Sequence, residues 1–317
     1  MWLDITLLLS GFVVLVLGAD WLVNGASALA KKYKVSDLAI GLTIVAFGTS
    51  APELVVNVFA AAQGHHDIVL GNIIGSNNFN LLVILGIAGL ITPLVVQSST
   101  VWKEIPFSLL AVAMLYIFAN DLFTDGPGVI SRIDGIVLLV FFALFLWYVA
   151  KQLKSDPHES EVPHKKYSAL KMTLLIVGGL AGLVIGGRLV VTSAVEMARV
   201  FGMSEKLIGL TIVAAGTSLP ELATSVVAAL KKNNDIAVGN IIGSNIFNIF
   251  LILGLSSVIQ PVSFSTVFNT DILLLTFGTL LLFIAMFTGK SHRLDRWEAA
   301  ILLMMYIGYT VYLVGKG

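Results

Sequence analysis

Two glutamates stand near the middle of long apolar segments, where an ionised side chain is costly. Glu53 lies about midway along an apolar segment at residues 38–62, and Glu221 about midway along 207–230. A charged carboxylate at the centre of a bilayer costs about 2.5 to 3.5 kcal/mol even on insertion-based scales. The only basic residue well inside an apolar segment is Arg188, which we expect near a helix end with its charge at the interface. The glutamates therefore predict a cation or proton site rather than a structural ion pair.

A proline precedes each glutamate, at Pro52 and Pro220. Proline lacks an N–H and clashes with the carbonyl four residues earlier, so we expect both helices to break there. A broken helix at membrane depth is tolerated where it lines a cavity. Freed carbonyls and nearby hydroxyls are hard oxygen donors, which Na+ and Ca2+ prefer. The hydroxyls beside the two breaks belong to Thr49, Ser50, Thr217 and Ser218.

A polar stripe with a four-residue spacing runs along the apolar segment that follows each broken one. We interpret these side chains as further oxygen ligands that face the glutamates. They are Asn72, Ser76 and Asn80, and then Asn240, Ser244 and Asn248. Two GxxxG pairs in the same segments predict close helix packing. These are Gly71 with Gly75 and Gly239 with Gly243.

The composition places these residues in a membrane protein with a small polar substrate. The chain has 317 residues, of which 57% are hydrophobic and 12% charged, against about 25% charged in a soluble domain. Lys plus Arg equals Asp plus Glu at 19 each, so no charge excess indicates a nucleic acid, and no protein partner is evident. There is no cysteine, which excludes thiolate metal sites. The sequence contains no phosphate loop, nucleophile triad or zinc motif, so it gives no indication of an enzyme or of a cofactor.

The apolar segments predict an all-α integral membrane protein with ten transmembrane helices. A span needs about 20 mostly apolar residues. We expect the first segment to remain as a span, because it has no basic region that would make it a signal peptide. The ten expected spans are residues 3–29, 38–62, 68–95, 105–119, 133–150, 170–197, 207–230, 236–259, 270–288 and 297–315.

The two halves of the chain are an internal duplication. A shift of 168 residues aligns 41–80 with 209–248 at 26 of 40 positions without a gap. Each half has five expected spans, an odd number, so the second copy enters the membrane from the opposite side. We therefore predict two inverted five-helix repeats, with helices 2, 3, 7 and 8 broken. The repeats are residues 1–150 and 169–317, joined by a polar linker at 151–168.

Basic residues in the loops predict the orientation. Fourteen Lys and Arg residues fall on the side of the linker and four on the other side. Because cytoplasmic loops carry the excess of basic residues, we expect a cytoplasmic linker and two extracellular termini.

These motifs, GTSAPE with GTSLPE and GNIIGSNNFN with GNIIGSNIFN, resemble those of the prokaryotic sodium/calcium exchangers of the calcium/cation antiporter superfamily. The resemblance covers essentially the whole chain. It implies Ca2+ bound between Glu53 and Glu221, with help from Thr49 and Thr217. It also implies Na+ sites and two central amides at these positions: Ala46, Ser50, Ser76, Ala214, Ser218 and Ser244 for Na+, and Asn80 and Asn248 at the centre.

The resemblance implies a secondary antiporter of the cell membrane that exchanges Ca2+ for Na+ by alternating access. It further suggests that the first and sixth spans slide against the rest, and that about three Na+ move per Ca2+, which would make transport electrogenic. Some relatives have Asp at the position of Asn248, so the occupancy of the central position stays open. The alternative is a Ca2+/H+ antiporter that uses the same glutamates. A channel is disfavoured by a single buried acidic site, and an intramembrane hydrolase by the missing nucleophile.

The expected orientation can be tested by labelling single cysteines, because the chain has none of its own. Ser160→Cys should react with a membrane-impermeant maleimide only from the cytoplasmic side, and Gly317→Cys only from outside, because of the basic-residue bias. Labelling of both positions from the same side would mean that the span count is wrong.

Overall fold

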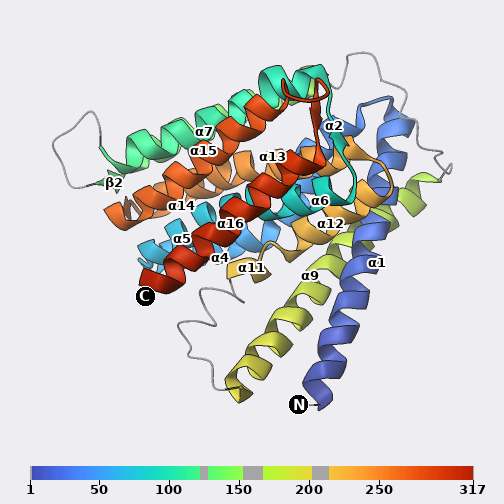
Figure 1. Ribbon diagram of the computed structural model, residues 1–317, viewed down its shortest axis with the longest axis horizontal. Helices are drawn as coiled ribbons and strands as arrows, with labels where there is room; N and C mark the ends of the chain where they lie inside the picture. Colours follow the sequence, from blue (N-terminus) through green and yellow to red (C-terminus); the bar gives the residue numbers. More distant parts are fainter. Residues whose placement is uncertain (1, 122–127, 153–166, 202–213, 317) are drawn as a thin grey trace.

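The computed structural model describes residues 2–121, 128–152, 167–201 and 214–316. It is a bundle of long helices from which one pair, α1 and α9, projects (Figure 1). The first half contains α1 (Trp2–Tyr33), α2 (Asp37–Ile40), the π-helical η1 (Gly41–Val45), α3 (Ala46–Thr49), α4 (Ala51–Ala62), α5 (His66–Asn78), the π-helical η2 (Phe79–Ile84), α6 (Leu85–Ile91), β1 (Leu94–Val95), the π-helical η3 (Thr100–Glu104), α7 (Ile105–Ala119), β2 (Val129–Ile130) and α8 (Arg132–Gln152).

The second half repeats much of this order. It contains α9 (Ala169–Val200), α11 (Ala214–Gly216), α12 (Leu219–Leu230), α13 (Asn234–Ile246), the π-helical η5 (Phe247–Leu253), α14 (Gly254–Ile259), β3 (Val262–Ser263), the 3-10 turn η6 (Thr266–Phe268), α15 (Asn269–Ala285), β4 (Arg293–Leu294) and α16 (Arg296–Lys316). The two-residue strands join the halves, because β1 pairs with β4 and β2 with β3, both antiparallel.

The described residues contain seven helices that are long and apolar enough to cross a membrane, or eight if one bent pair counts as a span. The bent pair is Asp37–Thr49 with Ala51–Ala62, at an angle of 49°, which confirms the break expected at Pro52. Part of the expected span at 207–230 falls outside the described residues, and Leu219–Leu230 alone is a shorter apolar helix. The helix α16 is not among the seven. The count of ten therefore stays a prediction.

The third and eighth spans are not broken, so the expectation of a break in each of them is wrong. Each runs as one continuous helix, His66–Ile91 and Asn234–Ile259. Neither segment contains a proline, so every backbone N–H remains available for helical bonding. Each helix instead widens into a π-helical stretch at η2 or η5, a feature that often marks a functional site.

The long helices α1 and α9 contact each other through glycine. A Cβ added at Gly18 would lie 2.7 Å from the backbone N of Leu183, and one at Gly186 would lie 2.6 Å from that of Leu15. Near one end of the pair, Gly25 lies against Ile176. Residue numbers rise along α1 as they fall along α9, so these equivalent helices run in opposite directions. A larger side chain at these glycines would push the two backbones apart.

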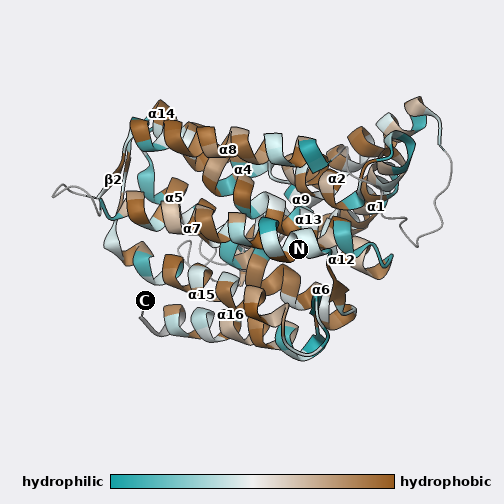
Figure 2. Cartoon of the chain, turned by 90° about the horizontal axis from the view of Figure 1, so that it is seen from above, coloured by the Kyte–Doolittle hydropathy of each residue, from teal (hydrophilic) through white to brown (hydrophobic). Residues whose placement is uncertain are grey.

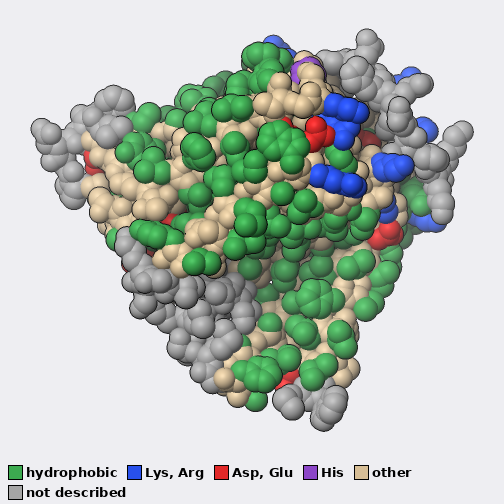
Figure 3. Space-filling model, in the orientation of Figure 1, with side chains coloured by type: hydrophobic (Ala, Val, Ile, Leu, Met, Phe, Trp, Pro, Cys, Tyr) green, Lys and Arg blue, Asp and Glu red, His purple; other side chains and the backbone are tan. Residues whose placement is uncertain are grey.

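The outer surface is apolar, as a lipid-facing surface must be. Large apolar side chains are exposed along α1, α8, α9, α15 and α16, and hydrophobic residues predominate on these helices (Figure 2). In the space-filling view, hydrophobic side chains cover most of one face, and Lys and Arg gather toward one end of it (Figure 3). This distribution is that of an integral membrane protein.

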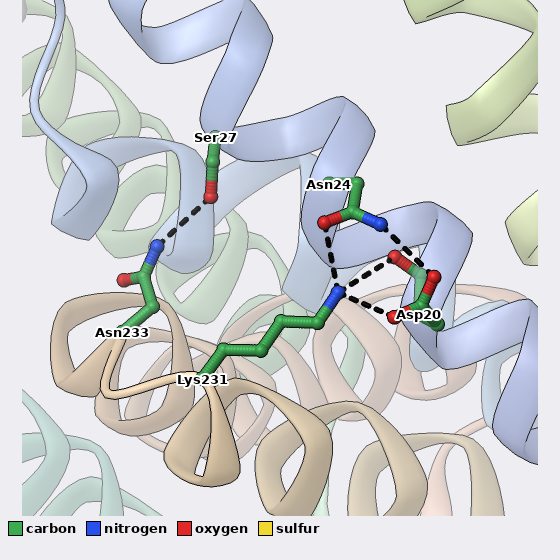
Figure 4. Close-up of polar contacts among 5 residues, drawn as sticks. All are labelled: Asp20, Asn24, Ser27, Lys231 and Asn233. Atoms are coloured by element: carbon green, nitrogen blue, oxygen red, sulfur yellow. Dashed lines mark hydrogen bonds and ion pairs between the residues drawn. The ribbon is translucent and has the colours of Figure 1, made fainter. Parts of the chain in front are cut away.

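Polar contacts hold α1 to the turn between α12 and α13 (Figure 4). Lys231 Nζ lies 2.6 Å from Asp20 Oδ1 and donates to Asn24 Oδ1 at 2.8 Å. One turn further along α1, Asn233 Nδ2 donates to Ser27 Oγ at 2.9 Å. The repeat equivalents of Asp20 and Lys231 are an arginine and a glutamine, so this ion pair has no counterpart of the same chemistry in the other half.

Candidate cation site

Each central glutamate lies in the first turn of a helix that begins within the bundle. Glu53 follows the turn at Ser50 that separates α3 from α4, and Glu221 follows the turn at Ser218 that precedes α12. Proline occupies the first turn of both helices, where its missing N–H costs nothing. The N-terminal end of a helix favours a negative charge. The local sequence therefore creates a helix start at membrane depth and places a carboxylate on it.

The two glutamates face each other across the halves. Both are almost completely buried, and they lie close enough for their charges to interact. Ser50 Oγ, from the first half, donates to Glu221 Oε1 at 3.0 Å. In the second half, the hydroxyls of Thr217 and Ser218 lie beside Glu53. Each carboxylate is thus surrounded by hydroxyls from the opposite half.

The threonines of the two motifs are held by asparagines of the opposite half. Thr49 Oγ1 donates to Asn240 Oδ1 at 3.0 Å. Asn72 Nδ2 donates to Thr217 Oγ1 at 3.4 Å. Because these amide atoms contact the threonines, the interpretation of Asn72 and Asn240 as ligands that face the glutamates is wrong. They orient the threonine hydroxyls instead.

A second pair of supporting residues, Asn57 and Ser225, was missed by the sequence reasoning. Asn57 Nδ2 donates to the Glu53 carbonyl at 2.7 Å and to Asn72 Oδ1 at 2.8 Å. Its repeat equivalent, Ser225, accepts from Asn240 Nδ2 at 2.9 Å. The signal was available, since each is a polar residue one helical turn after a glutamate on an otherwise apolar helix.

Several oxygen atoms at the site are buried and accept no hydrogen bond within the described residues. They come in equivalent pairs from the two halves: Glu53 Oε2 with Glu221 Oε2, Ser76 Oγ with Ser244 Oγ, and Asn80 Oδ1 with Asn248 Oδ1. A buried polar atom without a partner is costly. Carboxylate, hydroxyl and amide oxygens are the ligands that Ca2+ takes, at six to eight per ion. The donor set fits a hard cation.

The structure describes the two predicted alanines, Ala46 and Ala214, to different extents. A Cβ added at Gly243 would lie 2.8 Å from Ala46 Cβ, so α3 packs directly on α13 as the Gly239–Gly243 pair predicts. A Cβ at Gly75 would meet no described atom within 4 Å, so the close packing expected of Gly71 and Gly75 stays a prediction. The Ala46 carbonyl accepts from Ser50 N at 3.0 Å and lies 3.3 Å from Thr49 Oγ1. Only the backbone of Ala214 is described, and its side chain lies outside the described structure.

The charges of the two glutamates are not balanced by a base. Within the described part of the chain, no ion pair includes Glu53 or Glu221, and no group of three or more His, Asp or Glu residues could hold a metal. A site with two carboxylates and neutral oxygens suits an ion that binds and leaves again. The fold and the site together define a membrane protein that carries cations.

Comparison with known proteins identifies the family. The family described as "Sodium/calcium exchanger protein" matches residues 3–151 and 171–315. A putative antiporter CaxA of Alkalimonas amylolytica is 41% identical over 95% of each chain. The sodium/calcium exchanger MaX1 of Methanosarcina acetivorans is 34% identical over 97% of each chain. A structure of the sodium-calcium exchanger NCX_Mj superposes with a TM-score of 0.84 at 32% identity over 98% of each chain.

The chain therefore belongs to the sodium/calcium exchanger family. The similarity to NCX_Mj extends over almost all of both chains, so it includes the fold and not only the motifs. The resemblance inferred from the two repeated motifs is confirmed. The protein is a membrane cation antiporter.

Ser50→Ala tests whether the hydroxyls of one half support the carboxylate of the other. The substitution removes the hydrogen bond to Glu221, and a hydrogen bond to a charged group contributes about 1.5 to 3 kcal/mol. The Ca2+ concentration for half-maximal transport should rise about tenfold or more. Ser10→Ala, on the exposed face of α1, is the matched control. An unchanged Ca2+ dependence in Ser50→Ala would contradict this contact's role.

Proposed function

We propose that this protein exchanges Ca2+ for Na+ across the cell membrane, with Ca2+ held between Glu53 and Glu221. The observation that carries the proposal is the pair of buried carboxylates, one from each half, with no basic partner among the described residues. The relatives' names support the choice of ions. Thr49 and Thr217 complete the Ca2+ site in this proposal, since their hydroxyls are oriented by Asn240 and Asn72.

Charge balance couples the two ions. Two ionised glutamates give the site a charge near −2, which one Ca2+ or at least two Na+ neutralise. Moving the bare pair past an apolar barrier would cost several kcal/mol, whereas a loaded site passes more easily. Only the loaded protein then changes conformation, and each Ca2+ that crosses in one direction requires Na+ to cross in the other. More than two Na+ per Ca2+ would make the exchange electrogenic.

The neutral oxygens favour Na+ over H+ as the counter-ion. A proton needs only a carboxylate to carry it, so oxygens beyond the six to eight that Ca2+ takes would serve Na+ and not H+. Here, Ser76 Oγ, Ser244 Oγ and the central amide oxygens are buried without hydrogen-bond partners among the described residues. Such oxygens suit Na+ sites that flank the glutamates. In this proposal, Ala46, Ser50, Ala214 and Ser218 line those sites through their backbone or hydroxyl oxygens.

Alternating access requires a surface on which part of the protein can move. The core presents Gly48 and Gly216 to Leu180 and Val191 of α9, so few core side chains protrude where the α1 and α9 pair would slide. The two inverted repeats, residues 1–150 and 169–317, would then supply two conformations of similar energy. The contacts of Lys231 with Asp20 and Asn24 would have to open when α1 moves. The proposed orientation keeps the linker in the cytoplasm and both termini outside.

Purified protein in sealed vesicles tests the exchange. Vesicles loaded with Na+ and placed in Na+-free medium with 45Ca2+ should accumulate Ca2+, because Na+ leaving the vesicle drives Ca2+ inward. Clamping the membrane potential with K+ and valinomycin should change the rate, since net charge moves if more than two Na+ leave per Ca2+.

The same vesicles separate the two counter-ions. Both controls use vesicles loaded with choline in place of Na+. In the first the pH is equal inside and outside, and in the second the interior is made acidic. Uptake that needs only the acid interior would establish the Ca2+/H+ antiporter and refute Na+ coupling.

A further inference from the structure

Four asparagines join the two halves next to the cation site. Asn80 Nδ2 donates to Asn245 Oδ1 at 3.1 Å, and Asn248 Nδ2 donates to Asn77 Oδ1 at 2.9 Å. Asn77 Nδ2 and Asn245 Nδ2 each donate to the other's backbone carbonyl at 3.3 Å. All four side chains are almost completely buried. The arrangement is the same in both halves. Each half contributes one of the two predicted ligand asparagines, Asn80 or Asn248, and one asparagine that accepts a hydrogen bond from the ligand asparagine of the other half.

The backbone carbonyls fix which way every amide in this cluster points. A carbonyl can only accept, so the Asn77 atom that faces the Asn245 carbonyl must be Nδ2. Its other atom, Oδ1, can also only accept, so Asn248 must present Nδ2 to it. The remaining atom of Asn248 is then Oδ1, which has no hydrogen-bond partner among the described residues. The same argument applies in the other half: the Asn77 carbonyl requires Nδ2 of Asn245, so Asn245 presents Oδ1 to Asn80, which donates with Nδ2 and leaves its own Oδ1 without a partner among the described residues.

The two backbone carbonyls that accept these amides lie close to the π-helical stretches. Asn77 and Asn245 each lie two residues before the first residue of a π-helical stretch, η2 or η5. A backbone carbonyl has two lone pairs, so it can accept a side-chain amide of the opposite half beside any helical bond that it makes.

We propose that Asn77 and Asn245 are positioning residues that make Asn248 and Asn80 present oxygen, and not NH2, to the transported cation. The inference rests on the proposed function, because it assigns these amide oxygens to the ion. If the side-chain amide of Asn80 or Asn248 rotated by half a turn, it would direct two N–H donors at Ca2+ or Na+. The site would then lose an oxygen ligand and gain a repulsive dipole. The two residues thereby set the preference of the site's centre for cations.

Aspartate at position 248 gives a test, because a carboxylate has an oxygen at both ends and needs no orientation. In the Asn248 protein, Asn77→Leu removes the acceptor that holds the amide. Equilibrium 45Ca2+ binding to the detergent-solubilised protein should weaken about tenfold or more, as expected for the loss of a buried hydrogen bond and a misdirected ligand. In an Asn248→Asp protein, the same Asn77→Leu change should weaken Ca2+ binding by no more than about twofold. There it also removes an oxygen that would face the new carboxylate.

The matched control is Asn78→Leu. Asn78 is the neighbouring buried asparagine and donates to the Asp271 carbonyl at 3.0 Å, and among the described residues its side chain makes no hydrogen bond to Asn80 or Asn248. Asn78→Leu should leave Ca2+ affinity within about twofold in both backgrounds. If Asn77→Leu does not yield a single folded species, Asn245→Leu measured with and without Asn80→Asp repeats the test in the other half.

Three results would count against the inference, and the loss of the inference alone is distinguishable from the loss of the proposed function. An equal loss of Ca2+ affinity from Asn77→Leu with Asn248 and with Asp at 248 would mean that Asn77 only supports the helices, and would overturn the inference alone. The same holds for unchanged affinity in both backgrounds. Absence of saturable Ca2+ binding by the unsubstituted protein would overturn the proposed function together with the inference.

Discussion

The structure depends on one electrostatic constraint, which is that two carboxylates are buried together without a basic partner among the described residues. Taking a charge out of water costs several kcal/mol, and removing the balancing charge from a buried group costs more. The charges of Glu53 and Glu221 must therefore be neutralised, either by a bound cation or by protonation of the carboxylates. A transporter uses this need, because the empty site resists movement across the membrane and the loaded site does not.

The surrounding contacts distribute this site over both halves of the chain. Hydroxyls and amides of one half reach the carboxylate, the threonine or the ligand asparagine of the other, as in the bond from Ser50 to Glu221. The short strands also pair across the halves. Each half thus depends on the other for several hydrogen bonds around the site. The core is thereby held as one unit, against which the α1 and α9 pair would move in the proposed exchange.

The sequence predicted the membrane fold and the two central glutamates because both follow from local patterns. Apolar length defines a span, and a proline before a buried glutamate defines a broken helix with a charge on it. The breaks expected in the third and eighth spans were wrong, because no proline interrupts these helices, and each continues through a π-helical stretch. The roles of Asn72 and Asn77 could not be predicted. Spacing shows that a side chain lies on a polar stripe, but not which atom it presents or to which partner.

Equilibrium binding of 45Ca2+ to Glu53→Gln and Glu221→Gln is the measurement that tests the shared site most directly. Each substitution keeps nearly the same shape, so a change reports the charge. Glu196→Gln, which removes an exposed carboxylate paired with Arg199, is the control for the chemistry of the substitution. The account predicts that each central variant, eluting as a single folded species, loses Ca2+ affinity by about a hundredfold or more, while Glu196→Gln binds normally. Ca2+ binding like that of the unsubstituted protein in either central variant would contradict a site shared between the two glutamates.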